Sequence, residues 1–187
     1  AELEVRDGGK LVREMVGQLT RHEADVAVST LPIDHPLLTG QVVGRWSLAC
    51  VFRPDHPLAA RRSISLRQLK DERLIAFSPD TPQGKLIAQH WQDDELSRSA
   101  RIEVRSGQVA CALAACGAGV AVVDELSARA WNSDRLACRP LRASPSHRVF
   151  VVRHAHEPQS GLALAFRQEV ERALRAAQVD ASTVAAG

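Results

Sequence analysis

Three polar residues could contribute to a ligand site, because each lies where a predicted strand leads into a predicted helix. They are Thr81, Ser106 and Asp124. Side chains of these types cap helices, and the capped helix ends present backbone N–H groups and the positive end of the helix dipole. A capping role alone remains an alternative for each residue. Their shared position at one edge of a predicted sheet favours hydrogen bonding of a small polar molecule.

The residue pattern gives little support to catalytic or metal chemistry. The sequence has neither a Gly-x-Ser-x-Gly elbow nor a Gly-x-x-x-x-Gly-Lys-Ser/Thr phosphate loop. His154 and His156 would lie on one strand face without a third ligand at a suitable spacing. His35 and His56 each precede a proline in a turn, so we expect both to be solvated. We therefore expect no enzyme activity, no metal and no cofactor.

The four cysteines are Cys50, Cys111, Cys116 and Cys138, and they form no C-x-x-C motif. Their apolar neighbours favour buried free thiols in a reducing compartment. A redox sensor that uses Cys111 and Cys116 is the alternative. On one helix those two side chains would diverge by about 140°, so a disulfide between them would require the helix to unwind.

Charge and hydropathy narrow the class of protein. The chain has 187 residues, with 24 basic and 22 acidic side chains and a net charge of +2. This balance argues against a basic nucleic-acid arm, an acidic tail and electrostatic binding to membranes. No apolar run approaches the roughly 18 residues that a membrane span requires. The first residues also lack the features of a signal peptide, so we expect a cytoplasmic protein.

Predicted strands and helices alternate along the chain, which favours an α/β fold with parallel sheets. Strands are predicted at 3–5, 24–29, 42–53, 74–77, 101–104, 120–123, 136–140 and 146–153, and helices at 10–20, 66–69, 82–91, 108–116, 125–131 and 162–174. The two long strands, 42–53 and 146–153, are predicted to cross between two lobes. The first lobe would contain residues 1–47 and 154–187, and the second would contain residues 48–153.

Four segments, in this order, resemble the effector-binding domain of LysR-type transcriptional regulators. They are 24–28 (ADVAV), 52–59 (FRPDHPLA), 64–69 (ISLRQL) and 116–123 (CGAGVAVV). The resemblance covers about residues 1–175. It implies two Rossmann-like subdomains, joined by two crossover strands as in periplasmic binding proteins, that clamp a small-molecule effector. It also implies a homodimer or tetramer that binds DNA only through an N-terminal helix-turn-helix domain, which this sequence lacks.

The resemblance also bears on the ligand and on the start of the domain. Residues 80–82 and 122–128 are similar to members that respond to opines or amino acids, although Glu125 replaces the usual proline. By this resemblance, the first strand and helix of the family's domain would be absent from these residues, and that strand would lie between 3–5 and 26–28. We expect a carboxylate effector, held by helix N-termini. The predicted effector-binding residues are Thr30, Leu31, Ser78, Asp80, Thr81, Ser106, Gly107, Val123 and Asp124.

Two rival functions remain open on the sequence. A solute-binding protein of a transport system shares the two-lobed architecture, but it would normally carry an export signal. A lone α/β enzyme is the second rival, and detectable turnover would support it. Helix-turn-helix sequence upstream of these residues would favour the regulator.

Overall fold

The computed structural model describes residues 8–90, 100–131 and 133–186. The chain forms two compact units, one of Ala1–Trp46 with Ser146–Gly187 and one of Ser47–Pro145. The expected second boundary at residue 153 is wrong. Strand β8 (His147–His154) lies in the first unit because both of its edges pair with strands of that unit.

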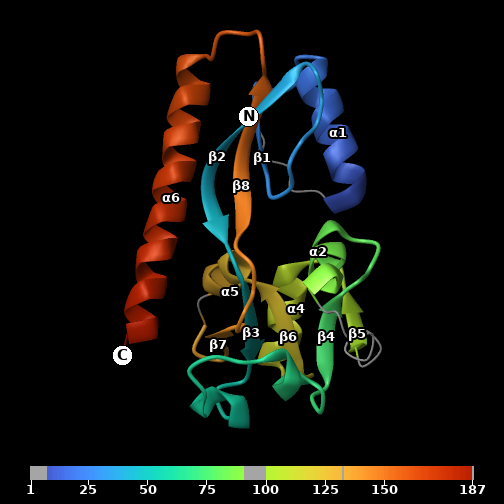
Figure 1. The fold of residues 1–187 in the computed structure, drawn as a ribbon, viewed down its shortest axis with the longest axis vertical. Helices are drawn as coiled ribbons and strands as arrows, with labels where there is room; N and C mark the ends of the chain where they lie inside the picture. Colours follow the sequence, from blue (N-terminus) through green and yellow to red (C-terminus); the bar gives the residue numbers. More distant parts are fainter. Residues whose placement is uncertain (1–7, 91–99, 132, 187) are drawn as a thin grey trace. The chain divides into compact units, whose positions relative to one another are not determined.

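The first unit contains a three-stranded sheet in the order β1-β8-β2 (Figure 1). Strand β1 (Val26–Ser29) and strand β2 (Leu38–Trp46) both pair with β8 in antiparallel fashion. The expected single strand 42–53 is therefore two strands, because β2 ends at Trp46 and the next strand belongs to the other sheet. The strand expected at 3–5 lies outside the described residues.

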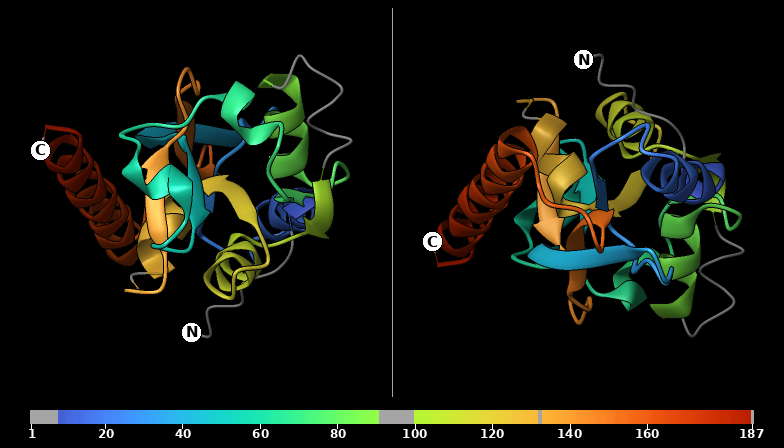
Figure 2. Two further views of the ribbon diagram at one scale, coloured as in Figure 1. Left: turned by 90° about the horizontal axis from the view of Figure 1, so that it is seen from below. Right: turned by 90° about the horizontal axis from the view of Figure 1, so that it is seen from above.

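Helices α1 (Gly8–Thr20) and α6 (Gly161–Ala186) lie on opposite sides of this sheet (Figures 1 and 2). On one side, Leu19 of α1 forms a core with Leu38 and Val152. On the other side, Arg167 of α6 donates a 2.7 Å hydrogen bond to Gln41 of β2. In the part of the chain that the structure describes, no helix is long and apolar enough to cross a membrane.

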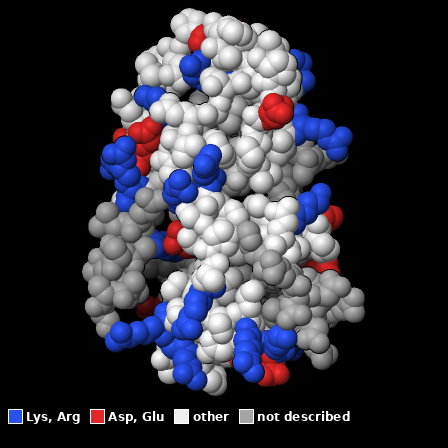
Figure 3. Space-filling model, viewed as in Figure 1, with Lys and Arg blue, Asp and Glu red and all other residues white. Residues whose placement is uncertain are grey.

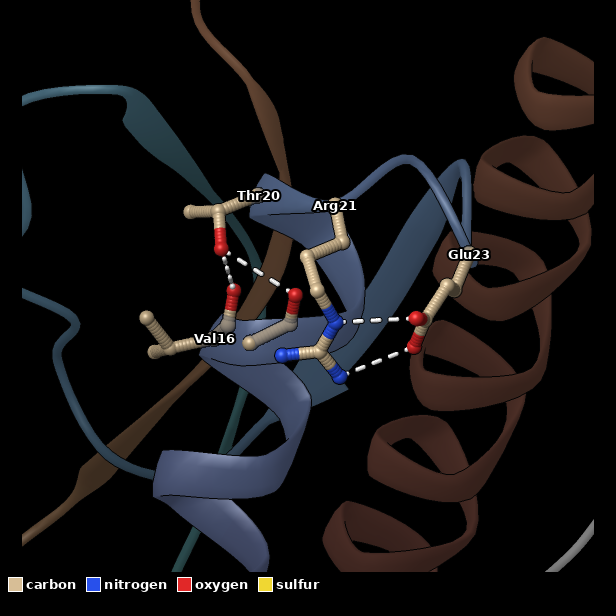
Figure 4. Close-up of polar contacts among 5 residues, drawn as sticks. Val16, Thr20, Arg21 and Glu23 are labelled. Atoms are coloured by element: carbon tan, nitrogen blue, oxygen red, sulfur yellow. Dashed lines mark hydrogen bonds and ion pairs between the residues drawn. The ribbon is translucent and has the colours of Figure 1, made fainter.

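Local polar contacts complete the end of α1 (Figure 4). The Thr20 hydroxyl donates to the carbonyl oxygens of Val16 and Gly17, at 2.9 and 3.1 Å. Just beyond the helix, the Arg21 guanidinium makes two hydrogen bonds to the Glu23 carboxylate, at 2.8 and 2.9 Å. Both side chains of this pair are exposed, so we assign it little weight in stability.

The second unit contains a five-stranded sheet in the order β5-β4-β6-β3-β7. Its strands are β3 (Leu48–Phe52), β4 (Leu74–Phe77), β5 (Ala100–Val104), β6 (Val120–Asp124) and β7 (Ala137–Pro140). Strand β4 runs parallel to β5 and β6, whereas β3 runs antiparallel to β6 and β7. The expected parallel arrangement therefore holds for three strands of this sheet.

Two short 3₁₀ helices and three α-helices surround this sheet. They are η1 (Pro57–Ala60), η2 (Leu66–Leu69), α2 (Pro82–His90), α4 (Gly107–Ala115) and α5 (Glu125–Trp131). Helix α4 packs against β6 and β3 through small side chains, and Ala110, Cys111 and Ala114 are fully buried. Small residues at this contact allow the helix to approach the sheet closely.

The expectation that His56 is solvated is wrong. Its Nδ1 accepts a 3.2 Å hydrogen bond from the Leu58 backbone N–H, which caps η1. Its Nε2 lies 3.3 Å from the Glu72 carboxylate, and its ring lies 5.3 Å from that of buried Phe52. Three partners from separate segments therefore hold this imidazole in place.

Candidate functional site

Polar residues gather at one edge of the second unit because three parallel strands end there. Strands β5, β4 and β6 are neighbours in that order and lead into α4, α2 and α5 respectively. The carboxyl ends of parallel strands are where open α/β sheets bind ligands. The structure brings seven predicted residues to this edge: Ser78, Asp80, Thr81, Ser106, Gly107, Val123 and Asp124.

Thr81 is a buried helix cap rather than an open ligand contact. The residue is only 1% exposed. Its hydroxyl donates to the Ser78 carbonyl oxygen at 2.7 Å and accepts from the Gly84 backbone N–H at 3.0 Å. Val123 is fully buried as well. Both residues are therefore buried beneath this edge and support the residues that are exposed there.

Asp124 also positions a helix, because its carboxylate is used at the start of α5. Oδ1 accepts from the Ser127 backbone N–H and Oδ2 accepts from the Ser127 hydroxyl, both at 2.7 Å. A Cβ at Gly107 would lie 2.5 Å from Ser127 Oγ. The glycine therefore permits the starts of α4 and α5 to lie side by side.

Ser106 differs from the other two caps. It occupies the N-cap position of α4, yet its side chain makes no capping hydrogen bond. Its hydroxyl instead contacts Gln108 Oε1 at 3.0 Å. The residue is partly exposed, so we expect its hydroxyl to be available to a ligand.

An exposed ion pair joins the ends of β4 and β5. Arg105 Nη1 lies 2.6 Å from Asp80 Oδ2, and the side chains are 53% and 63% exposed. Hydrogen bonds from Arg105, and then from Ser78, hold the pKa of the Asp80 carboxyl below its usual value. Asp80 is among the residues predicted from the sequence, whereas Arg105 is not. The missed signal was that each residue follows one of two adjacent parallel strands.

We call Ser78, Asp80, Arg105 and Ser106 the polar edge. It combines two hydroxyls, a cation and an anion on the surface of one unit. Thr30 and Leu31 belong to the first unit, where the Ser29 hydroxyl holds the turn that follows β1 through the Leu31 backbone N–H at 3.1 Å. That these two residues face the polar edge stays a prediction.

The histidines at the end of β8 lie near a third imidazole. The His154 ring centroid is 6.3 Å from that of His156 and 5.2 Å from that of His22. Within the described ranges, no group of three or more His, Cys, Asp or Glu side chains could hold a metal ion.

All four cysteines are free, and their environments differ. Burial raises the pKa of Cys50 above its usual range and that of Cys111 to about 11. Cys116 is exposed at the end of α4. Because Cys111 is buried and Cys116 is exposed, the case for a redox pair of these two cysteines is weaker.

We expect N-ethylmaleimide at pH 8 to modify Cys116 rapidly while Cys50 and Cys111 stay unmodified in the folded protein. The thiolate is the reactive form, and burial disfavours it. Peptide mass spectrometry at successive times would measure the order of labelling, with labelling in urea as the control. A disulfide between Cys111 and Cys116 after mild oxidation would contradict this assignment.

Comparison with known proteins finds a matching family model and several relatives. The family model described as the LysR substrate binding domain matches residues 2–175. The transcriptional activator protein LysR of Escherichia coli K12 is 27% identical over 125 residues, which are 67% of this chain and 40% of that protein. The regulatory protein NocR of Agrobacterium tumefaciens T37 is 25% identical over 152 residues, 81% of this chain and 51% of that protein. The chain thus spans about half of the length of these relatives, or less.

Solved structures share the fold. The effector-binding domain of a BenM variant has a TM-score of 0.70 and 21% identity, covering 91% of this chain and 79% of that one. The CcmR regulatory domain of Synechocystis PCC6803 in complex with 2-PG has a TM-score of 0.66 and 19% identity, covering 86% and 78%. Both structures agree with the α/β architecture described above.

Proposed function

Because the chain belongs to the family of LysR substrate-binding domains, we propose that it senses a small-molecule effector for a DNA-binding transcriptional regulator. The curated relatives named above are a transcriptional activator and a regulatory protein, which favours this function over a transport solute-binding protein. This function would require the whole protein to lie in the cytoplasm with the DNA. Its assembly would be a homodimer or tetramer, and its DNA contact a helix-turn-helix domain outside these 187 residues.

The polar edge is the site at which we expect the effector to bind. The Asp80–Arg105 pair is the observation that supports it, because this pair is exposed at the carboxyl end of adjacent parallel strands. A ligand carboxylate could replace Asp80 on the Arg105 guanidinium, whose planar fork suits carboxylates. The Ser106 hydroxyl would add a neutral hydrogen bond.

This chemistry suits an amino acid, an opine or another carboxylate. An ammonium group on the same ligand would pair with Asp80 as the carboxylate pairs with Arg105. Structural neighbours were solved with benzoate and with shikimate, and both of these ligands are carboxylates. Thr30 and Leu31 of the first unit remain predicted effector contacts.

A thermal-shift screen of amino acids, opines and aromatic carboxylates would test the proposal. A ligand at 100 times its Kd should stabilise the protein by about 2.7 kcal/mol. We expect Arg105→Gln to raise the Kd of a carboxylate ligand about 10- to 100-fold, since a charged hydrogen bond contributes about 1.5–3 kcal/mol.

Arg53→Gln is the matched control, because Arg53 also pairs with an exposed aspartate. Arg53 follows β3, which runs antiparallel to β6 and therefore ends on the side of the sheet opposite the polar edge. This variant should leave the Kd unchanged. Equal effects of the two variants would overturn the assignment of Arg105. The absence of any stabilising ligand in the screen would count against effector sensing by this chain.

A further inference from the structure

The segment between β3 and β4 concentrates basic charge that the nearly neutral chain conceals. Residues 53–73 contain six Lys and Arg side chains but only three Asp and Glu side chains. Two of the three acids are engaged, Asp55 by Arg53 at 2.7 Å and Glu72 by His56 at 3.3 Å. The segment therefore keeps a local excess of positive charge.

Four arginines of this segment are exposed and make no ion pair with the residues that the structure describes. We call Arg61, Arg62, Arg67 and Arg73 the basic face. In Figure 3, Lys and Arg side chains gather over the end of the second unit where Figure 1 places η1 and η2. Arg73 precedes β4 and the polar edge follows β4, so the two surfaces lie at opposite ends of that strand.

A fifth arginine fixes the backbone of the basic face. The Arg139 guanidinium donates to the carbonyl oxygens of Ala59 and Arg61, at 2.7 and 2.6 Å. The Ile64 N–H donates to the Pro140 carbonyl oxygen at 3.0 Å, so the segment is tied to β7. Because the backbone is already anchored, less conformational entropy is lost when the surrounding side chains bind a partner.

The composition of the basic face distinguishes among anionic partners. A protein interface needs an apolar or aromatic centre, but the exposed large hydrophobic residues among those described all lie outside 53–73. Residues 53–73 contain no Phe, Trp or Tyr, and the His56 ring is held by Phe52 and Glu72. The segment therefore offers no free ring for stacking single-stranded bases or anchoring in a membrane. Exposed guanidinium groups alone match a double-stranded phosphate backbone.

We propose that the basic face binds the phosphate backbone of duplex DNA independently of sequence. It would add a contact to DNA that is separate from any helix-turn-helix domain. Neutralising about four phosphates predicts a slope of log K against log salt of about −3.6, from about −0.9 per phosphate. Affinity should then fall about 100-fold between 50 and 200 mM salt.

Fluorescence anisotropy with a labelled 20-base-pair duplex of arbitrary sequence would test this in the 187-residue chain. The variant R61Q/R62Q/R67Q/R73Q should lose most binding at 50 mM salt, at least about 10-fold. The control R13Q/R21Q/R172Q/R175Q removes the same charge from exposed sites on α1, the turn after it and α6. It should keep the steep salt slope and lose much less affinity. Circular dichroism would establish that both variants are folded.

Three outcomes would overturn the proposal. The first is no duplex binding by the unaltered chain at 20 mM salt. The second is an equal loss of affinity in the two variants, which would indicate net charge rather than the basic face. The third is equal or tighter binding to poly-glutamate or to phosphatidylglycerol vesicles, which would indicate an acidic protein or a lipid surface. The proposal is supported if duplex DNA binds more tightly than poly-glutamate and the vesicles, and if this binding depends on the four arginines.

Discussion

Replacing Gly119 with alanine is expected to lower the free energy of unfolding by about 3 kcal/mol or more. Gly119 has a φ of +154° and lies between α4 and β6. A Cβ at this position would overlap the Arg73 carbonyl oxygen, which accepts a 2.9 Å hydrogen bond from the Val120 N–H. The clash is with backbone, so relieving it would break the start of the β4–β6 pairing.

Gly161→Ala is the matched control for this change. Gly161 begins α6, and an added Cβ there would meet no atom within 4 Å. We expect it to be neutral or to stabilise by about 0.4–1 kcal/mol, because alanine reduces the entropy of the unfolded chain. Urea denaturation followed by circular dichroism would measure both variants. Equal midpoints would mean that the chain around Gly119 relaxes without cost.

The second large effect is expected at Thr81. Thr81→Val keeps the side-chain shape but removes the hydroxyl that joins Ser78 and Gly84 at the start of α2. We expect a loss of about 2 kcal/mol, since the change removes a helix cap and leaves a buried backbone N–H without its partner. Ser106→Ala should cost less than about 0.5 kcal/mol, because surface changes that remove no cap have small effects.

The same two variants separate structural caps from ligand contacts. Chemical denaturation gives the stability difference, and titration with an effector found in the screen gives the affinity. Ser106→Ala should weaken effector binding while the protein stays stable. A large stability loss in Ser106→Ala, or none in Thr81→Val, would reverse the roles given to these residues.

The sequence alone determined the elements whose signals are local. Strand β4 at 74–77 and helix α5 at 125–131 have the bounds that their apolar runs and caps predicted. The caps at Thr81 and Asp124 are confirmed by their hydrogen bonds to backbone N–H groups. The motif at 116–123 indicated the family through its own consecutive residues. These signals lie within a few residues of the feature that they predict.

Only the tertiary structure decided which strands share a sheet. The apolar run 42–53 was predicted to cross between the lobes, but it gave no sign that it is divided into two strands, β2 and β3. The run 146–153 gave no sign that β8 pairs between β1 and β2 within one sheet. Likewise, Arg105 lies 25 residues from Asp80 in the chain and meets it only because β4 and β5 are parallel neighbours. Strand pairing, burial and long-range ion pairs depend on residues distant in sequence, so periodicity and caps leave them undetermined.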